Sequence, residues 1–294
     1  MERISFYDQI ARNKRNSILL TLFVGAIIIA IGYAISLVFP TEYVFLILSI
    51  SIILGVFWPI ISYNNSGKIA IWSVGAVPAN RTQFKQYYDI VEGLTLASGL
   101  PMPKLYIMKG QQINAFASGK DPQSAVVCVT EGALIKLTKQ ELEGVLAHEM
   151  SHVANYDIRF MTLVSVLVGI ISIMAQMFLR SLWLSDNRNN EGKNGGIFVL
   201  IGIVLAILAP IVTTLVQLAV SRKREYTADA TAVKFTRTPT GLIGALSKIK
   251  NDSSEIKVSG SMAPLFFTKP NLSAAELFAT HPPLEKRIEI LKKM

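Results

Sequence analysis

The sequence has little cysteine and little histidine, which restricts the metal sites that it can form. Of its 294 residues, one is cysteine and three are histidine. A single cysteine excludes an intrachain disulfide framework and a four-cysteine metal site. We expect Cys128, in the apolar run Ala125–Val129, to be a small buried residue. Two of the three histidines, His148 and His152, lie in one short stretch, so any histidine metal site is expected there.

Charged residues are also scarce. They make up 17% of the chain against 51% hydrophobic residues, and the mean hydropathy is +0.43, which is high for a soluble protein. A net charge of +9 would suggest nucleic acid in a soluble domain. Here the basic residues flank apolar runs, where membrane topology explains them. We therefore expect a membrane protein and no nucleic-acid partner.

Four apolar runs are long enough to cross a bilayer as helices. Runs 17–39 and 43–63 are joined by a link of three residues, so segment 1–63 is predicted to form a transmembrane hairpin. Runs 160–179 and 195–220 form a second hydrophobic pair within segment 160–220, with Pro210 expected to bend the last run. The alternative for this second pair is a buried helical hairpin covered by protein.

Lysine and arginine near the ends of the runs predict the orientation. They are concentrated before the first run and directly after the last, at Arg222-Lys223-Arg224, whereas link 40–42 has none. Both termini are therefore expected in the cytoplasm of a multi-pass protein of the cell (inner) membrane. Segments 64–159 and 221–294 would then form two parts of one domain on the cytoplasmic face.

These two segments read as a mainly helical α+β domain. Residues 81–97 have the spacing of an amphipathic helix, and 104–108, 114–119 and 125–129 are predicted strands of a small β-sheet. Segment 221–294 reads as mostly helical, with loops.

The sheet is followed by a helix with metal-binding spacing. Thr138 and Glu141 match a capping box, and apolar residues then recur at helical spacing. His148 and His152 lie one turn apart on the same face, and Glu149 is placed to reach a metal-bound water as general base. The alternative is a pair of hydrogen-bonded histidines without a metal.

A catalytic zinc ion keeps three protein ligands and one open position. Glu225, at the start of the helix after the last apolar run, is the best third ligand, and Asp229 lies one turn further on. Asp229 could accept a hydrogen bond from the far nitrogen of a ligand histidine. The alternative is a solvated acidic face. We expect one Zn²⁺ per chain.

Two further groups are candidates for substrate binding. His281 or Arg287 could stabilise an oxyanion, although His281-Pro282-Pro283 could equally cap the final helix, 284–293. The strand that begins Asn114-Ala115-Phe116 could pair with a peptide substrate at the edge of the sheet, or lie inside it.

Taken together, His148-Glu149-Met150-Ser151-His152, then Glu225 and Asp229 after a hydrophobic pair, resemble the M48 family of zinc metallopeptidases. The 114–117 strand and the His281-Pro282-Pro283 segment also resemble that family. Two apolar runs before the motif and two after it are most similar to its HtpX branch of membrane proteases. The resemblance implies a gluzincin-like fold. It also implies proteolysis of misfolded or damaged membrane proteins at the cytoplasmic face, as part of quality control and the stress response.

Other functions fit parts of the sequence. Charges on both sides of the motif argue against an intramembrane protease, and the related proteases of prenylated proteins have more spans. A membrane scaffold or sensor with a non-catalytic metal site is the alternative outside enzymes, but such a site needs a fourth ligand and none is evident. A homo-oligomer is compatible with the sequence.

Overall fold

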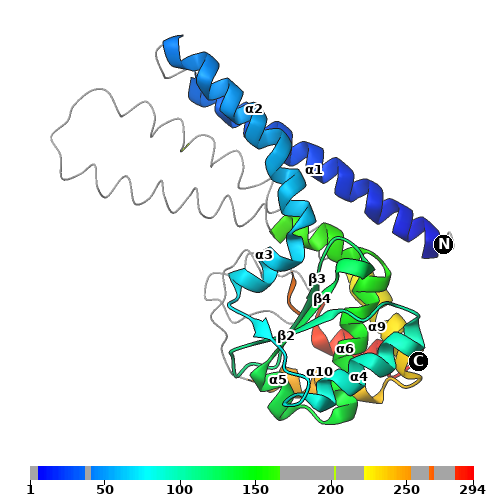
Figure 1. Ribbon diagram of the computed structural model, residues 1–294. Helices are drawn as coiled ribbons and strands as arrows, with labels where there is room; N and C mark the ends of the chain where they lie inside the picture. The colour runs from blue at the N-terminus through cyan, green and yellow to red at the C-terminus, as the bar shows by residue number, and fades with distance from the viewer. Residues whose placement is uncertain (1–5, 37–40, 166–201, 203–221, 253–264, 268–281) are drawn as a thin grey trace.

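The computed structural model describes residues 6–36, 41–165, 202, 222–252, 265–267 and 282–294. Two long helices, α1 (Phe6–Ser36) and α2 (Thr41–Asn64), form a hairpin that projects from a rounded body (Figure 1). Both contain windows apolar enough to cross a membrane, Asn13–Ala30 and Thr41–Asn64. The predicted runs 17–39 and 43–63 fall largely within these helices. The second predicted pair lies almost wholly outside the described residues.

Among the described residues, the body contains a four-stranded mixed sheet packed against helices. Its strands are β1 (Val77–Pro78), β2 (Lys104–Met108), β3 (Ala115–Ser118) and β4 (Val126–Thr130). The strand order is β1-β2-β4-β3; β2 pairs parallel with β4, and the outer pairs are antiparallel. The three strands predicted from the sequence are present, and no end differs from the prediction by more than one residue. The two-residue β1 was missed, because a pair of residues has no periodicity.

The described helices of the body are α3 (Ser66–Ser73), α4 (Lys85–Ser98), α5 (Glu131–Lys136), α6 (Lys139–Ala154), α9 (Arg222–Thr236), α10 (Thr240–Lys250) and α11 (Leu284–Leu291). The helix predicted at 81–97 is α4, which begins four residues later. The predicted metal-binding helix is α6. Its capping box forms as expected: Glu141 N–H donates to Thr138 Oγ1 at 3.3 Å, and Thr138 N–H donates to Glu141 Oε2 at 2.7 Å.

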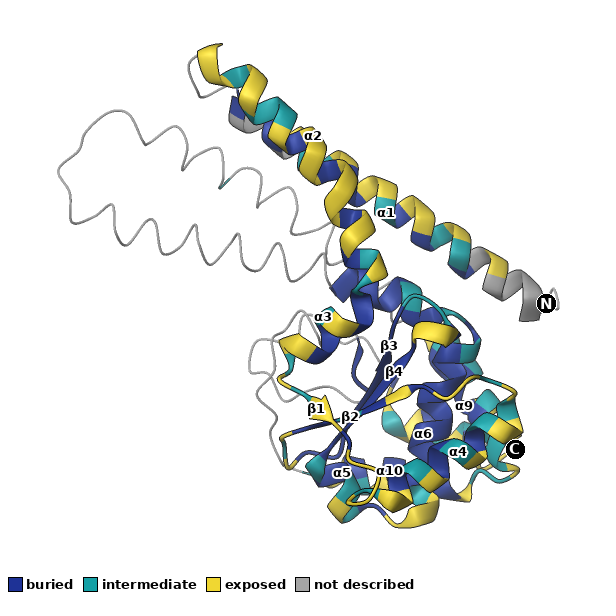
Figure 2. Ribbon diagram, in the orientation of Figure 1, coloured by how far each residue is buried: buried dark blue, intermediate teal, exposed yellow. Residues whose placement is uncertain are grey.

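Both faces of the sheet are buried. Successive side chains of a strand point to opposite faces, and the apolar side chains of each face pack into a different cluster. On β4, Val127 and Val129 belong to a core with α4, α6 and α10. Val126 and Cys128 face the other way, into a second cluster with Leu20 of α1 and the apolar residues of 160–164. Cys128 is buried as expected, and burial raises the pKa of its thiol. Figure 2 shows buried residues at the centre of the body and exposed residues along the hairpin. The second cluster joins hairpin to body.

Candidate metal centre

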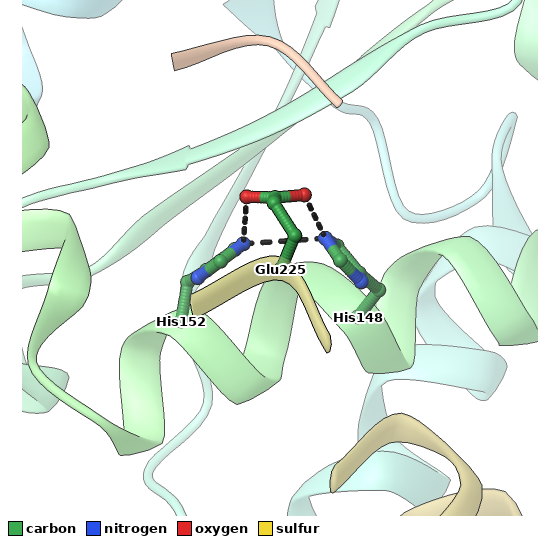
Figure 3. A group of neighbouring side chains, drawn as sticks. All are labelled: His148, His152 and Glu225. Carbon is green, nitrogen blue, oxygen red and sulfur yellow. Dashed lines mark hydrogen bonds and ion pairs between the residues drawn. The ribbon is translucent and has the colours of Figure 1, made fainter. Parts of the chain in front are cut away.

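Three buried side chains from two helices meet beside the sheet. α6 carries His148 and His152 on one face, and α9 brings Glu225 opposite them (Figure 3). The two Nε2 atoms lie 3.2 Å apart. Glu225 Oε2 lies 3.5 Å from His148 Nε2, and Glu225 Oε1 lies 3.7 Å from His152 Nε2. One ligand atom from each residue fits within 4.8 Å of the others, as in a metal site.

Two aspartates fix the orientation of the imidazoles. Asp229 Oδ1 lies 2.9 Å from His148 Nδ1, and Asp157 Oδ2 lies 3.1 Å from His152 Nδ1. An ionised carboxylate only accepts hydrogen bonds, so each Nδ1 carries a proton and each ring turns its Nε2 toward Glu225. Each Nε2 can bind a metal once it carries no proton. Three electron-pair donors then converge on one point. A cation such as Zn²⁺ fits this donor set, with a histidine–carboxylate pair behind each nitrogen ligand.

Asp229 stands where the sequence suggested, one turn after Glu225. Asp157 was missed as a partner of His152. It follows the end of α6, after Tyr156, whose φ of 59° turns the chain back toward the helix. The available signal was an acidic residue just past the metal-binding helix, which alone indicates little.

The pKa of His152 reflects this environment. Burial lowers the pKa, but the hydrogen bond to Asp157 and the charges of Glu225, Asp157 and Glu149 together raise it to about 9. A histidine must lose its proton before it can bind a metal. The same carboxylates that favour a proton on His152 also favour a divalent cation, so the site is electrostatically suited to Zn²⁺.

Arg287 is fully buried on the Nδ1 side of His148. Its Nη2 and Nε donate to Asp229 at 2.6 and 2.9 Å, and its Nη1 lies 3.6 Å from Glu225 Oε2. Burial alone would raise the pKa of Asp229, but Arg287 and the hydrogen bond from His148 hold it below its usual range. The guanidinium therefore keeps Asp229 ionised and in place. The other predicted oxyanion group, His281, lies outside the described residues.

Glu149 lies between the metal ligands and the sheet. Its carboxylate accepts a hydrogen bond from the backbone N–H of Ala117 on β3. Burial raises its pKa; the charges of His148 and His152 oppose this, and Glu225 adds to it. A raised pKa brings a carboxylate closer to the range in which it exchanges protons with water.

Strand β3 is at the edge of the sheet. Its residues are buried, and Phe116 packs edge-on against Phe266 at 5.2 Å. The carbonyl of Ala115 accepts a hydrogen bond from Phe267 N–H at 2.8 Å, so the outer side of β3 can pair with extended chain. Asn114, which precedes the strand, is buried, and its Oδ1 accepts from Ala115 N–H at 3.0 Å.

The model of peptidase family M48 matches residues 81–294 of this sequence. The chain belongs to peptidase family M48. It is similar along its whole length to proteins named protease HtpX homolog, with 42% identity to that of Caldanaerobacter subterraneus subsp. tengcongensis over 100% of this chain and 99% of the relative. The homolog of Listeria monocytogenes is 38% identical over 98% of this chain and 99% of the relative. The crystal structure of S. mikatae Ste24p matches with 21% identity and a TM-score of 0.48, covering 96% of this chain and 65% of that one.

With the family established, the cluster of His148, His152 and Glu225 is the metal site of a zinc metallopeptidase. The predicted resemblance to the HtpX branch is confirmed by the full-length relatives. Among the described residues the metal cluster has three protein ligands. Three protein ligands suit a catalytic zinc. Because the chain belongs to a peptidase family, the alternative of a scaffold or sensor with a non-catalytic metal site is not supported.

Proposed function

We propose that this M48 metallopeptidase hydrolyses peptide bonds of misfolded or damaged membrane proteins at the cytoplasmic face of the cell membrane. The observation that carries the proposal is a buried His-His-Glu site, with both histidines oriented by aspartates, in a body attached to an apolar helical hairpin. A site so close to the hairpin favours substrates that are themselves in or near the bilayer. The excess of lysine and arginine at residues 222–224 supports the cytoplasmic orientation.

The residues of the site have complementary roles. His148, His152 and Glu225 would hold one Zn²⁺, which when bound lowers the pKa of a water molecule and polarises a carbonyl. Glu149 takes the proton of the attacking water and passes it to the leaving amine. Its burial and its bond to the backbone of Ala117 support this role, because they fix the carboxylate beside the ligands.

The remaining groups, one of them a backbone carbonyl, bind substrate or support the ligands. The Ala115 carbonyl, on the outer side of β3, accepts a hydrogen bond from a backbone N–H of the substrate. In this structure it accepts the same kind of hydrogen bond from the N–H of Phe267. Asp229 orients His148. Arg287, with two hydrogen bonds to Asp229, is better placed to hold that carboxylate than to meet an oxyanion. His281 stays a prediction for the oxyanion.

Replacing the general base tests the proposal directly. In Glu149→Gln we expect zinc to be retained and the cleavage rate of an unfolded membrane protein in detergent to fall by about 10²–10⁴-fold, the usual contribution of a general base. The matched control is Glu143→Gln on the same helix, which should keep full activity. Cleavage by Glu149→Gln at the wild-type rate would remove Glu149 from its role.

Orientation needs a separate measurement. A reporter fused after Lys250, in α10, should be active only as a cytoplasmic fusion. Activity of a reporter that works outside the cytoplasm would contradict the charge argument.

A further inference from the structure

Asn13 of α1 is a buried polar residue at the start of a candidate membrane span. The span begins at Asn13, and this residue is 3% exposed, whereas Ile18 and Leu19 further along the same helix are about 60% exposed. Burying an amide is costly unless its hydrogen bonds are satisfied. The partners of Asn13 therefore show what the residue does.

Those partners lie at the metal centre. Asn13 Nδ2 donates to Asp157 Oδ1 at 2.7 Å and to the backbone carbonyl of Asn155 at 3.0 Å. Asn13 Oδ1 accepts from Arg224 Nη2 at 3.4 Å, and Arg224 Nε lies 3.3 Å from Asp157 Oδ1. The first helix of the chain thus reaches the turn after α6 and the residue directly before the ligand Glu225.

Asp157 connects these contacts to a metal ligand. One of its oxygens is held by Asn13 and Arg224, and the other lies 3.1 Å from His152 Nδ1. A carboxylate that orients a ligand histidine must itself be held by hydrogen bonds. On the basis of the proposed function of this site, we propose that Asn13 is a positioning residue of the metal centre, through which the N-terminal membrane helix fixes Asp157 and hence His152.

Neighbouring contacts hold the same turn. Lys14 Nζ lies 4.3 Å from the centre of the Tyr156 ring, and Tyr156 has a positive φ of 59°. Such a backbone conformation persists in a non-glycine residue when its surroundings fix it. The turn from Asn155 to Asp157 is therefore clamped by two successive residues of α1. The hairpin is part of the metal site as well as a membrane anchor.

Zinc affinity of the full chain in detergent, measured by competition with a chelator, tests the inference. In Asn13→Ala we expect zinc to bind about tenfold more weakly, since loss of an outer hydrogen-bond partner costs about that factor. The matched control is Asn16→Ala, a half-buried asparagine of the same helix, which should bind zinc as the wild type does. Equal affinity in Asn13→Ala and Asn16→Ala would overturn the inference.

A reversed pair separates positioning from general stability. Asn13→Asp alone sets two carboxylates against each other. In Asp157→Asn alone, the amide oxygen can still accept from Asn13, but the NH2 group then faces the N–H of His152 Nδ1, so two donors meet. The double variant Asn13→Asp/Asp157→Asn restores one donor and one acceptor while an amide oxygen still faces His152. We expect each single variant to bind zinc about tenfold more weakly and the double variant to recover most of that loss. A double variant that folds but binds no better than the singles would contradict the inference.

Cobalt(II) supplies a readout that a merely structural role would not change. When His152 is displaced, the visible absorption bands of bound cobalt should shift in Asn13→Ala and not in Asn16→Ala. If Asn13→Ala changes neither the cobalt bands nor the zinc affinity, Asn13 belongs only to the membrane anchor and the inference is wrong. If the wild-type chain itself binds no zinc, both the proposed metal site and the role of Asn13 are wrong. If the wild type and every variant bind zinc equally well, the metal site stands and only the role of Asn13 is wrong.

Discussion

Most large apolar side chains of α2 face outward, whereas most of those in the body face inward. Phe45 is 82% exposed, and the buried residues of α2 are Ser51, Gly55, Pro59 and Ser62. In the body, valine, leucine and isoleucine fill the core, and the buried charges gather at the metal centre. Each region has the surface that its own solvent requires, lipid for the hairpin and water for the body.

The difference also concerns what holds each region together. Removal of apolar side chains from water stabilises the body. In lipid it contributes little to the association of helices, which depends on close packing of small residues instead. Gly25 and Gly55 lie where the backbones of α1 and α2 are in close contact. Buried charges need partners of opposite charge, and in the body Arg287 pairs with Asp229 and Glu225. The same kind of substitution should therefore have different effects in the two regions.

The largest effect is expected for Arg287→Met, which leaves two buried carboxylates without their cation. Breaking a buried ion pair by removing one partner costs about 3–5 kcal/mol of unfolding free energy. Thermal unfolding in detergent with a chelator present measures this without compensation by zinc. The control Lys293→Met removes the lysine of an exposed pair with Glu289 and should leave the midpoint unchanged. Similar midpoints in the two variants would contradict the account of Arg287.

Ile53→Lys tests the outward-facing surface of the hairpin. Ile53 lies at the middle of α2 and is 55% exposed, so in a bilayer its replacement by lysine opposes insertion by about 3 kcal/mol. The control is Leu96→Lys on α4, at an 87% exposed site of the body, which faces water and should have no such cost. The alkali-resistant membrane fraction measures both. Equal fractions would show that α2 does not face lipid at Ile53.

Two glycines allow the same substitution in both regions. A Cβ at Gly55 would lie 2.8 Å from the carbonyl oxygen of Gly25, and a Cβ at Gly144 of α6 would overlap the backbone of Leu242 on α10. Overpacking costs about 1–3 kcal/mol. We expect the cost of Gly144→Ala to be near the upper end of this range, because α6 and α10 are held in the packed core and cannot move apart. The cost of Gly55→Ala should be near the lower end, because α2 can shift in lipid. Unfolding midpoints in detergent would show the order, and the reverse order would contradict this reasoning.

Those elements that carry a local signal could be predicted from the sequence. The capping box and helical spacing define α6, and apolar length defines α1 and α2. The strand at 125–129 is found within one residue as β4 because β-branched residues cluster there. β1, α3 and α5 were not predicted, because segments of two, eight and six residues have too little pattern.

The metal centre was predictable in part for the same reason. His148 and His152 form a local motif, and Glu225 follows from the need for a third ligand. Asp157 and Asn13 could not be found, since their roles depend on α1 meeting the end of α6, a contact between residues far apart in sequence. Arg287 was singled out as an oxyanion candidate. Its hydrogen bonds to Asp229 appear only once α11 packs against α9.

The smallest expected effect is a gain in stability, at a glycine where no neighbouring segment leaves too little room for a Cβ. Gly93 lies within α4, is exposed, and would meet nothing within 4 Å if given a Cβ. Gly93→Ala should stabilise the body by about 0.5–1 kcal/mol, because alanine loses less conformational entropy in a helix. Gly99 ends the same helix with equally open space but a φ of 72°, so Gly99→Ala should cost about 1 kcal/mol. Unfolding midpoints that move in the same direction would contradict this, since sterically the two sites differ only in backbone conformation.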